Sequence, residues 1–413
     1  MFTAKISKAS TSKRRYDREE KKGSKENDGD DDESRDSKNV KSEEIMGVGA
    51  STGSGQYLVD FRIGSPPQKL LLVADTGSDL VWVKCSACRN CSNHKPGSVF
   101  FARHSLTFSP FHCYDHSCRM VRNPIRECNS SREHSTCRYE YTYADGSTTG
   151  GFFAREITTL STSSGRETKF GRLAFGCGFT ASGSASSFNG VMGLGRGPIS
   201  FSTQLGKRFG NKFSYCLMDY TISPPPTSYL FIGQAHTSPR PTTPLQTNPL
   251  SPTFYYVGIK DVSVNGVKLK IDSSVWCLNS DGNGGTVIDS GTTLTFLVEP
   301  IYSHILTAFK RRVKLPRVED PSLGFDLCVN VSGLQNPKFP ELSFKLVGDS
   351  LFTPPTQNYF IDAVEDVKCL AIQPVTSRSG FSVIGNLMQQ GFLFEFDRDE
   401  SKLGFSRHGC ALP

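Results

Sequence analysis

The chain has 413 residues, a length sufficient for two lobes of ordinary domain size. Its formal net charge is +7, and because it contains no run of about 18 apolar residues, the sequence predicts no membrane-spanning helix. Glycine (38) and proline (23) are plentiful. They separate short apolar runs in a manner typical of β-rich proteins.

Residues 1–50 are predicted to be a disordered polar tail or the remnant of a propeptide. Residues 1–45 hold 12 Lys or Arg and 12 Asp or Glu, and large apolar residues are almost absent there. The basic cluster at residues 13–15 is of the kind that binds phosphates or acts as a nuclear address, but the flanking acids cancel its field. We therefore expect no nucleic-acid partner, and the positive excess lies in the rest of the chain.

Strands are predicted, in chain order, at 57–64, 228–233, 254–271 and 392–397, where β-branched and aromatic residues stand between turn residues. Apolar residues recur at helical spacing only in 198–210 and 299–313. Helices should therefore be accessories to a mainly β fold.

Seven of the 13 cysteines crowd into residues 85–137, together with five of the eight histidines. The overlapping CxxC pairs of CSACRNC and the mixed HCYDHSC are compatible with zinc, but no clean set of four ligands can be assembled from these spacings. We favour disulfides, because a loop-rich segment without its own core needs cross-links to keep one shape. This cysteine density indicates an oxidising compartment. No apolar signal segment follows Met1, and we expect that the sequence is truncated or mis-started upstream.

Two short stretches share one design. VADTGSDLV at 73–81 and VIDSGTTLT at 287–295 each place an aspartate after apolar residues and before a hydroxyl residue, a glycine and a second hydroxyl residue. A single copy of such a triplet is usually a turn. Two copies in matching contexts, 214 residues apart, indicate a duplicated lobe.

If Asp75 and Asp289 meet in an apolar setting, their pKa values rise and the two carboxyl groups share a proton. One member can then take a proton from a trapped water while the other donates a proton to a carbonyl oxygen. The neighbouring residues should orient the carboxylates by hydrogen bonds. They are Thr76, Gly77 and Ser78 in the first stretch, and Ser290, Gly291 and Thr292 in the second.

These motifs, with others in the same order, resemble the pepsin-like aspartic peptidases, and more closely their plant, nepenthesin-like branch, over residues 56–409. The matching segments are ADTGSDLVWVKC, the flap-like YTYADGSTTGGFFAREITTL at 141–160, FGCG at 175–178, GVMGLGRGPISF at 190–201, FSYCL at 213–217, TVIDSGTTLTFL at 286–297 and SVIGNLMQQGFLFEFDRDESKLGFS at 382–406. The resemblance implies a mainly β, bilobal pepsin-like acid protease fold, with the active-site cleft between two homologous β lobes.

On this basis the N-terminal lobe covers residues 56–235 and contains the cysteine-rich insert 85–137, a Pro/Thr-rich linker covers 236–252, and the C-terminal lobe covers 253–413. The resemblance assigns Asp75 and Asp289 as the catalytic dyad and Tyr143 as the tyrosine of a flap that closes over substrate. Asp145-Gly146 independently favours a hairpin turn at the flap. Trp82 matches a tryptophan that supports the flap side of the cleft.

The resemblance also implies six disulfides and leaves Cys277, which we predict to be a buried free thiol. The pairs are Cys85 with Cys88, Cys91 with Cys177, Cys113 with Cys137, Cys118 with Cys128, Cys216 with Cys410, and Cys328 with Cys369. Asn90, Asn129 and Asn330 begin glycosylation sequons, which suit a secreted protein.

The sequence therefore predicts an aspartic-type endopeptidase that hydrolyses peptide bonds at acid pH, with no cofactor and no metal. We expect a monomer with a peptide or protein substrate and no membrane partner, secreted to the apoplast or delivered to the vacuole. The alternative is a catalytically inactive protein of the same fold that inhibits glycoside hydrolases. Such proteins typically lose an aspartate triplet or its hydroxyl residues, and both triplets are intact here.

Overall fold

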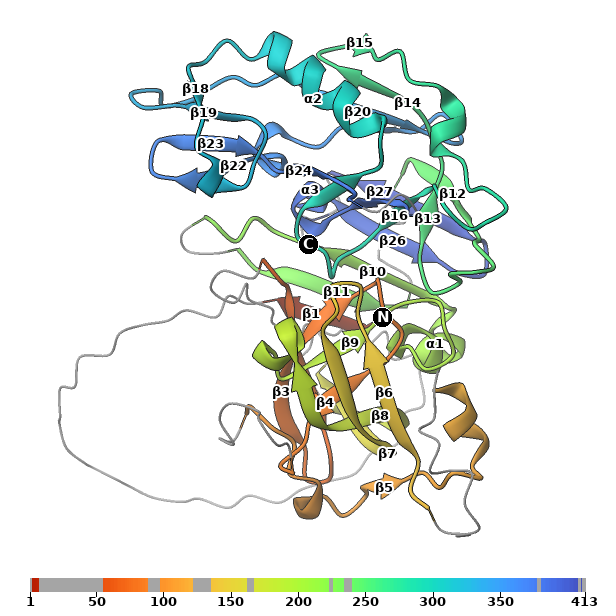
Figure 1. Ribbon diagram of the computed structural model, residues 1–413. Coiled ribbons are helices and arrows are strands. Elements are labelled where there is room, and N and C mark those ends of the chain that lie inside the picture. The colour runs from red at the N-terminus through yellow and green to blue at the C-terminus, as the bar shows by residue number, and fades with distance from the viewer. Residues whose placement is uncertain are drawn as a thin grey trace, which may run out of the picture.

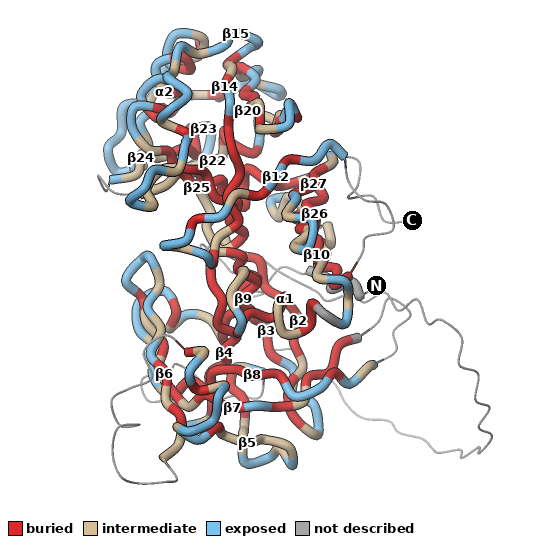
Figure 2. Tube along the Cα trace, turned by 90° about the vertical axis from the view of Figure 1, so that its right-hand side faces the viewer, coloured by how far each residue is buried: buried red, intermediate tan, exposed pale blue. Residues whose placement is uncertain are grey.

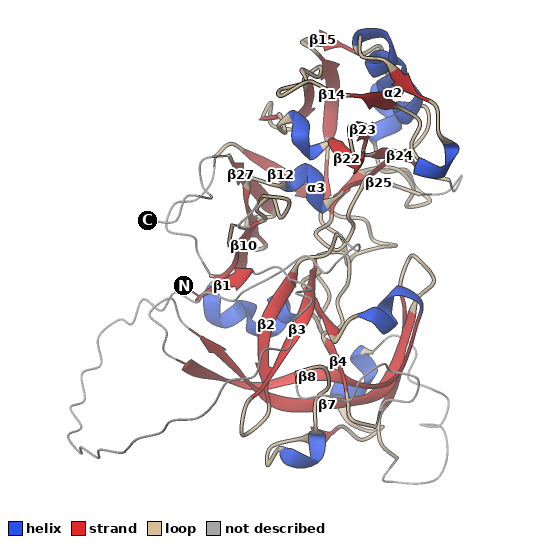
Figure 3. Ribbon diagram, turned by 90° about the vertical axis from the view of Figure 1, so that its left-hand side faces the viewer, coloured by secondary structure: helices blue, strands red, loops and turns tan. Residues whose placement is uncertain are grey.

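The computed structural model describes residues 55–87, 97–121, 135–161, 167–222, 226–233, 240–376, 380–407 and 410, and the backbone of residues 2–6. The described chain forms two lobes dominated by β-strands, which lie one above the other in Figure 1. The few helices are short and lie beside the strands (Figure 3). The prediction of a mainly β, bilobal fold is confirmed.

The N-terminal lobe contains strands β2 to β9. Their bounds are β2 Leu58–Ile63, β3 Gln68–Asp75, β4 Trp82–Lys84, β5 Ser109–Pro110, β6 Arg138–Thr142, β7 Thr148–Ser161, β8 Glu167–Ser182 and β9 Gly190–Gly193. The long antiparallel pair of β7 and β8 packs its inner face into the core of this lobe, where Phe153, Phe170 and Phe175 are fully buried.

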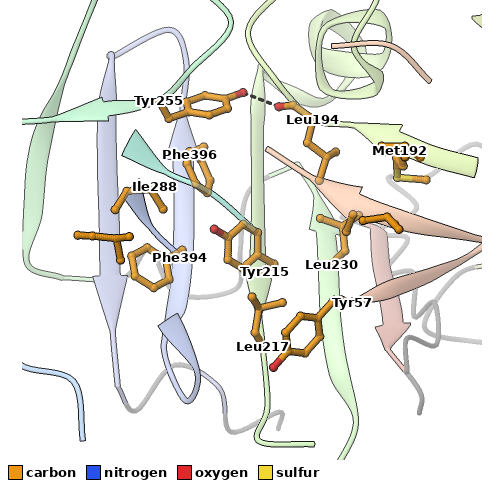
Figure 4. Close-up of a cluster of buried hydrophobic side chains, with 14 of the residues drawn as sticks. Tyr57, Met192, Leu194, Tyr215, Leu217, Leu230, Tyr255, Ile288, Phe394 and Phe396 are labelled. Carbon is orange, nitrogen blue, oxygen red and sulfur yellow. Dashed lines mark hydrogen bonds between the residues drawn. The ribbon is translucent and has the colours of Figure 1, made fainter. Parts of the chain in front are cut away.

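A six-stranded antiparallel sheet joins the two lobes. Its order is β1, β11, β10, β26, β27 and β12. The bounds are β1 Phe2–Ile6, β10 Lys212–Cys216, β11 Ser228–Ile232, β12 Thr242–Gln246, β26 Leu393–Asp397 and β27 Lys402–Ser406. Aromatic side chains from both halves of the chain form its core, including Tyr215, Tyr255 and Phe396 (Figure 4). The junction between the lobes is therefore part of the folded core.

The remaining strands belong to the C-terminal lobe. They are β13 Tyr256–Val257, β14 Ile259–Val264, β15 Val267–Lys268, β16 Thr286–Ile288, β17 Thr295–Leu297, β18 Arg317–Val318, β19 Cys328–Asn330, β20 Leu342–Leu346, β21 Leu351–Phe352, β22 Phe360–Val364, β23 Val367–Leu370, β24 Ile372–Pro374 and β25 Ser382–Ile384. Two four-stranded sheets, β15-β14-β20-β21 and β18-β19-β23-β22, form its outer part. In Figure 2 the buried residues follow the strands of both lobes, while the exposed residues lie mostly on turns and outer loops.

The predicted strands and the longer predicted helix are found where the patterns place them. Residues 2–6, in the segment predicted to be disordered, form β1, because they pair with β11. The segments 57–64, 228–233, 254–271 and 392–397 contain β2, β11, β13 to β15 and β26. The segment 299–313 contains helix α2 (Ile301–Arg312). The segment 198–210 is less helical than predicted: α1 covers only Phe201–Gly206, a 3-10 turn follows at Lys207–Phe209, and Gly210 ends it with φ +68°. Helix α3 (Asn386–Gln389) was not predicted, because one turn is too short for helical periodicity to show.

The disulfides correct four of the six implied pairs. Cys85 bonds to Cys177, which excludes both Cys85–Cys88 and Cys91–Cys177. The physical reason is the parallel pairing of β4 with β8, which leaves the two Cα atoms 5.4 Å apart, within the range of a disulfide. Cys118 bonds to Cys137, with Cα atoms 5.8 Å apart, which excludes Cys113–Cys137 and Cys118–Cys128.

The other cysteines complete this picture. Cys216 bonds to Cys410 and Cys328 bonds to Cys369, as the resemblance implied. Cys113 is also disulfide-bonded. Cys88, Cys91 and Cys128 lie outside the described residues. Cys277 is free but exposed, which corrects the prediction of a buried thiol: Trp276 occupies the core position, and its neighbour is turned outward.

Candidate active site

The two aspartates stand at the ends of two equivalent parallel strand pairs, one in each lobe, and meet at the boundary between the lobes. β3 ends at Asp75 and pairs in parallel with β9, so that Asp75 stands opposite Gly193. β16 ends immediately before Asp289 and pairs in parallel with β25, with Ile288 opposite Ile384. Apolar strands that are buried on both faces thus lead each carboxylate to the boundary between the lobes.

Each carboxylate is held by the same two kinds of donor. The Gly77 N–H donates to Asp75 Oδ1 at 2.8 Å and the Ser78 hydroxyl donates to Oδ2. In the other lobe, the Gly291 N–H donates to Asp289 Oδ1 at 2.8 Å and the Thr292 hydroxyl donates to Oδ2 at 2.6 Å. Of the four hydroxyl residues that were expected to orient the aspartates, Ser78 and Thr292 contact the carboxylates directly. The Thr76 and Ser290 hydroxyls bond to main-chain carbonyls instead.

A second set of hydrogen bonds links the two loops across the lobe boundary. The Thr76 N–H donates to Ser290 Oγ at 3.1 Å, and the Ser290 N–H donates to Thr76 Oγ1 at 2.9 Å. The Thr76 hydroxyl donates to the Ile288 carbonyl and the Ser290 hydroxyl to the Ala74 carbonyl. All donors and acceptors are buried, so these bonds fix the position of one loop relative to the other.

The glycines of the triplets are needed because the loops approach closely. A Cβ on Gly77 would lie 2.7 Å from Asp289 Oδ2, and a Cβ on Gly291 would overlap Asp75 Oδ1. Neither glycine has the positive φ that excludes other residues, so space alone requires it. The carboxylate of each lobe therefore lies against the backbone of the other.

Burial changes the protonation of the pair. Asp75 is 8% exposed and Asp289 is 9% exposed. Desolvation and the charge of Asp289 raise the pKa of Asp75 to about 7, although hydrogen bonds from Ser78 and Gly77 oppose this rise. Desolvation also raises the pKa of Asp289, against hydrogen bonds from Thr292, Gly291 and Asp75. Because burial raises the pKa of both carboxyl groups and the charge of Asp289 raises that of Asp75 further, the pair shares one proton.

The predicted hairpin stands over this pair. β6 and β7 are joined by a turn at residues 143–147, in which Gly146 has φ +79°. The Trp82 indole N–H donates to the Tyr143 hydroxyl at 2.7 Å, and the charge of Asp75 contributes, after desolvation, to the raised pKa of Tyr143. Tyr143 is therefore close to the dyad and is fixed by Trp82, a fully buried core residue.

A cavity of about 670 Å³ extends from the dyad between the hairpin and the C-terminal lobe. Aromatic residues line both sides: Tyr141, Tyr143 and Phe188 on one side, and Phe254, Phe296 and Phe381 on the other. Among its described lining residues the only charged groups are Asp75, Asp289 and Asp145. The cavity therefore has a mainly apolar wall with the two carboxyl groups at its floor.

Some functional features were not predicted from the sequence. Asp79, which is 6% exposed, lies behind the first loop, and the Gln389 amide donates to the Asp289 carbonyl at 3.0 Å. Neither residue type has a local pattern that indicates such a contact. Asn330 is half-buried and its Oδ1 accepts a hydrogen bond from the Ser332 N–H. Asn90 and Asn129 lie outside the described residues.

The two-lobed fold, with one aspartate loop from each lobe meeting beneath a hairpin, defines the pepsin-like class of proteins. Sequence models described as "Xylanase inhibitor N-terminal" and "Xylanase inhibitor C-terminal" match residues 57–234 and 254–407. The chain is 38% identical to Aspartyl protease family protein 2 of Arabidopsis thaliana, over 88% of this chain and 73% of that protein. It is 36% identical to aspartic proteinase nepenthesin-2 of Nepenthes gracilis, over 87% of this chain and 78% of that protein. The chain belongs to the plant pepsin-like aspartic protease family, in its nepenthesin-like branch.

Solved structures share the fold at lower sequence identity. The structure of edgp has a TM-score of 0.69 at 23% identity, and covers 86% of this chain and 92% of its own. Basic 7S globulin from soybean has a TM-score of 0.66 at 20% identity, with the same coverage. These likenesses show the fold and nothing further about activity.

Proposed function

We propose that the protein is an aspartic endopeptidase that hydrolyses peptide bonds at acid pH. The observation that carries this proposal is the pair of buried carboxyl groups, Asp75 and Asp289, held by matching hydrogen bonds at the floor of a long cavity. A buried pair that shares one proton supplies an acid and a base at the same point.

In the proposed reaction a water molecule lies between the two carboxyl groups. Ionised Asp289 accepts a proton from this water, whose oxygen attacks the carbonyl carbon of the peptide bond. Protonated Asp75 donates its proton to the carbonyl oxygen, which gives a neutral tetrahedral diol. Collapse of the diol breaks the carbon–nitrogen bond as the nitrogen receives the proton held by Asp289. One diol hydroxyl returns its proton to Asp75, which leaves a carboxylic acid and an amine and restores the dyad. No bond forms between enzyme and substrate, so no acyl-enzyme accumulates.

The walls of the cavity support a peptide as the substrate. Tyr143 lines the cavity, and its hydroxyl accepts a hydrogen bond from the Trp82 indole N–H. The aromatic residues on both sides suit bulky apolar side chains next to the bond that is cut. We infer that Tyr143 acts as the flap residue and that Asp75 and Asp289 are the catalytic residues.

The test is the Asp289→Asn variant assayed on acid-denatured globin. The wild type should cleave globin below about pH 7 and be blocked by a statine-type inhibitor, because a statine hydroxyl mimics the diol. The variant should lose at least about 100-fold in kcat, since an amide cannot act as the base. Asp320→Asn is the matched control, because it makes the same chemical change at an exposed residue of the same lobe. Full activity of Asp289→Asn would contradict the proposal.

The names of the matching sequence models favour one alternative, a protein that binds and inhibits a glycoside hydrolase. Under this alternative the wild type leaves globin intact but lowers xylanase activity, and Asp289→Asn inhibits as well as the wild type. The intact hydrogen bonds of both aspartate loops argue for the peptidase, because an inhibitor needs no shared proton.

We further propose that the protein works as a monomer in an oxidising compartment, secreted to the apoplast or delivered to the vacuole, with Asn330 as a glycosylation site. The disulfides support this location. Within the described residues, no helix is long and apolar enough to cross a membrane. Thiol labelling of the native protein from plant tissue should modify Cys277 alone among the described cysteines.

A further inference from the structure

We propose that Asp79 is a positioning residue that holds the Asp75 loop in its active geometry by linking it to both lobes. This inference rests on the proposed peptidase function and concerns the same site. Asp79 follows Asp75 by four residues, does not line the cavity, and takes part in none of the ion pairs between described residues. A buried carboxylate is costly unless donors surround it, so its hydrogen bonds indicate its role.

Two donors from different parts of the chain hold the Asp79 carboxylate. The Gly197 N–H donates to Oδ1 at 2.8 Å, and the Thr253 hydroxyl donates to Oδ2 at 2.7 Å. Gly197 lies in the loop that follows β9 of the N-terminal lobe, whereas Thr253 precedes β13 of the C-terminal lobe. We call these three residues the Asp79 clamp. The clamp ties one carboxylate to a segment of each lobe.

The loop that follows β9 is shaped around this carboxylate. A Cβ on Gly195 or Gly197 would overlap the Asp79 carboxylate oxygens, and a Cβ on Gly193 would overlap the Asp79 main chain. None of the three glycines has a positive φ, so lack of space requires glycine there: beside the Asp79 carboxylate at Gly195 and Gly197, and beside the Asp79 main chain at Gly193. The three glycines of GLGRG at 193–197 therefore leave the space that Asp79 occupies.

The same loop holds the main chain of the Asp75 loop. The Leu194 N–H donates to the Asp75 carbonyl at 2.7 Å, and the Gly195 N–H donates to the Ser78 carbonyl at 2.8 Å. The Tyr255 hydroxyl donates to the Leu194 carbonyl at 2.7 Å, as Figure 4 shows. Displacement of residues 194–197 would therefore be transmitted to the backbone of Asp75 and of Ser78, whose hydroxyl contacts the Asp75 carboxylate.

The clamp also reaches the wall of the cavity. The Arg196 N–H donates to the Thr253 carbonyl at 2.9 Å, so residues 196 and 253 are joined by main chain as well as through Asp79. Thr253 and its neighbour Phe254 line the cavity on the side of the C-terminal lobe. Release of the clamp should therefore change the position of the Asp75 loop relative to substrate, with a smaller effect on the binding pocket itself.

Two arginine side chains lie near the clamp, but Asp79 forms no ion pair among the described residues. Burial is the main cause of the raised pKa of Tyr255. Arg398 and Arg196 lower this pKa and Asp79 raises it, so the three side chains lie near the Tyr255 phenol. The two guanidinium groups bond to oxygen atoms, Arg196 to the Gln246 carbonyl and Arg398 to the Arg196 carbonyl. Neither guanidinium group bonds to Asp79, whose two carboxylate oxygens accept from the clamp donors Gly197 and Thr253.

The experiment measures kcat and KM of Asp79→Ala and Thr253→Val on a quenched peptide substrate. Native active sites are counted by titration with a tight-binding statine inhibitor, so that misfolded protein does not contribute. We expect kcat per native site to fall roughly 10- to 100-fold in Asp79→Ala and several-fold in Thr253→Val, while KM stays within about 2-fold, because small misplacements of catalytic groups are costly.

Conservative variants separate positioning from general stability. Asp79→Asn should recover most of kcat, because its amide oxygen can accept from Gly197 while its NH₂ group donates to the Thr253 hydroxyl. Thr253→Ser should likewise recover it. Glu156→Ala is the matched control: Glu156 is fully buried, is bonded to the Ser105 and Thr107 hydroxyls, and does not line the cavity. It should lower the unfolding temperature and leave kcat per native site unchanged.

Two results would overturn the inference. One is a kcat per native site within about 2-fold of the wild type in both Asp79→Ala and Thr253→Val. The other is an equal loss in Glu156→Ala, which would make the effect a general consequence of losing a buried carboxylate. An active wild type with these results contradicts the clamp alone. A wild type that cleaves nothing contradicts the proposed function, and the catalytic role of the clamp with it.

Discussion

The two aspartate loops, residues 75–79 and 289–293, hold their carboxylates alike but are supported differently from behind. In both, a glycine N–H and a hydroxyl bind the carboxylate. The Asp75 carbonyl accepts from the Leu194 N–H, whereas the Asp289 carbonyl accepts from the Gln389 side chain. The fifth position is the buried carboxylate Asp79 in the first loop and Thr293 in the second.

This difference shows which parts of the duplicated design are fixed by chemistry. The atoms that touch the shared proton are arranged alike in both lobes, since the pair needs two matched carboxylates. The supporting residues are free to diverge, provided that each loop remains rigid. The N-terminal loop additionally lies beneath the hairpin, and Trp82, seven residues after Asp75, contacts it; Phe296 occupies the equivalent place after Asp289.

The largest expected effect that tests this comparison is the change in the free energy of unfolding with pH. Desolvation and the charge of Asp289 raise the folded-state pKa of Asp75 from 3.8 to about 7. Because the folded state then binds more protons than the unfolded state, stability should fall as pH rises from about 4 to about 7, by at most about 4 kcal/mol. Asp75→Asn should remove this fall, as seen by urea unfolding at pH 4.5 and 7.5.

Asp289→Asn should remove less of the pH dependence than Asp75→Asn. The reason is that four hydrogen bonds, from Thr292, Gly291, Asp75 and Gly77, oppose the rise in the pKa of Asp289. Asp320→Asn, at an exposed carboxylate, is the control and should follow the wild type. If the free energy of unfolding fell equally with pH in the wild type and in Asp75→Asn, the dyad would not be the cause of the pH dependence.

The next effect concerns the two hydroxyl groups. Ser78→Ala and Thr292→Val should each lower kcat about 10-fold, because each removes a hydrogen bond to a charged or shared carboxylate. The Ser78 bond lowers the pKa of Asp75, so its loss should move the alkaline limb of the rate profile to higher pH. The Thr292 bond lowers the pKa of Asp289, so its loss should move the acid limb to higher pH.

The exchange variants Ser78→Thr and Thr292→Ser are the controls for this test. Each lobe already uses the residue that the other would receive, so both variants should stay within about 2-fold of the wild type. Equal shifts of both limbs in Ser78→Ala and Thr292→Val would contradict the assignment of the shared proton to Asp75.

The smallest effect is expected from Trp82→Phe, which gives the N-terminal lobe the residue that its partner lobe has at position 296. The ring stays buried, but the hydrogen bond to Tyr143 is lost. We expect KM to rise roughly 3-fold and stability to fall by about 1 kcal/mol. Trp276→Phe removes an indole N–H from the other buried tryptophan and should leave KM unchanged. Equal KM values in the two variants would contradict a role of Trp82 in holding the hairpin.

Much of this protein can be predicted from its sequence because the decisive patterns are local. Two Asp-hydroxyl-Gly triplets after apolar strands predict the dyad, and alternating residues around Asp145-Gly146 predict the hairpin. The amphipathic run at 299–313 predicts helix α2. Each of these signals spans a few residues, and its period or turn chemistry is set by the backbone itself.

Only the tertiary structure decided the rest. Cys85 could have bonded to the nearby Cys88, but the pairing of β4 with β8 brings Cys177 to it across 92 residues. Cys277 and Trp276 are adjacent in sequence, yet only the packing shows which one is buried. Asp79 looks like an ordinary turn residue until Gly197 and Thr253 converge on it. Contacts between distant segments have no local signature, since their geometry exists only after the lobes have packed.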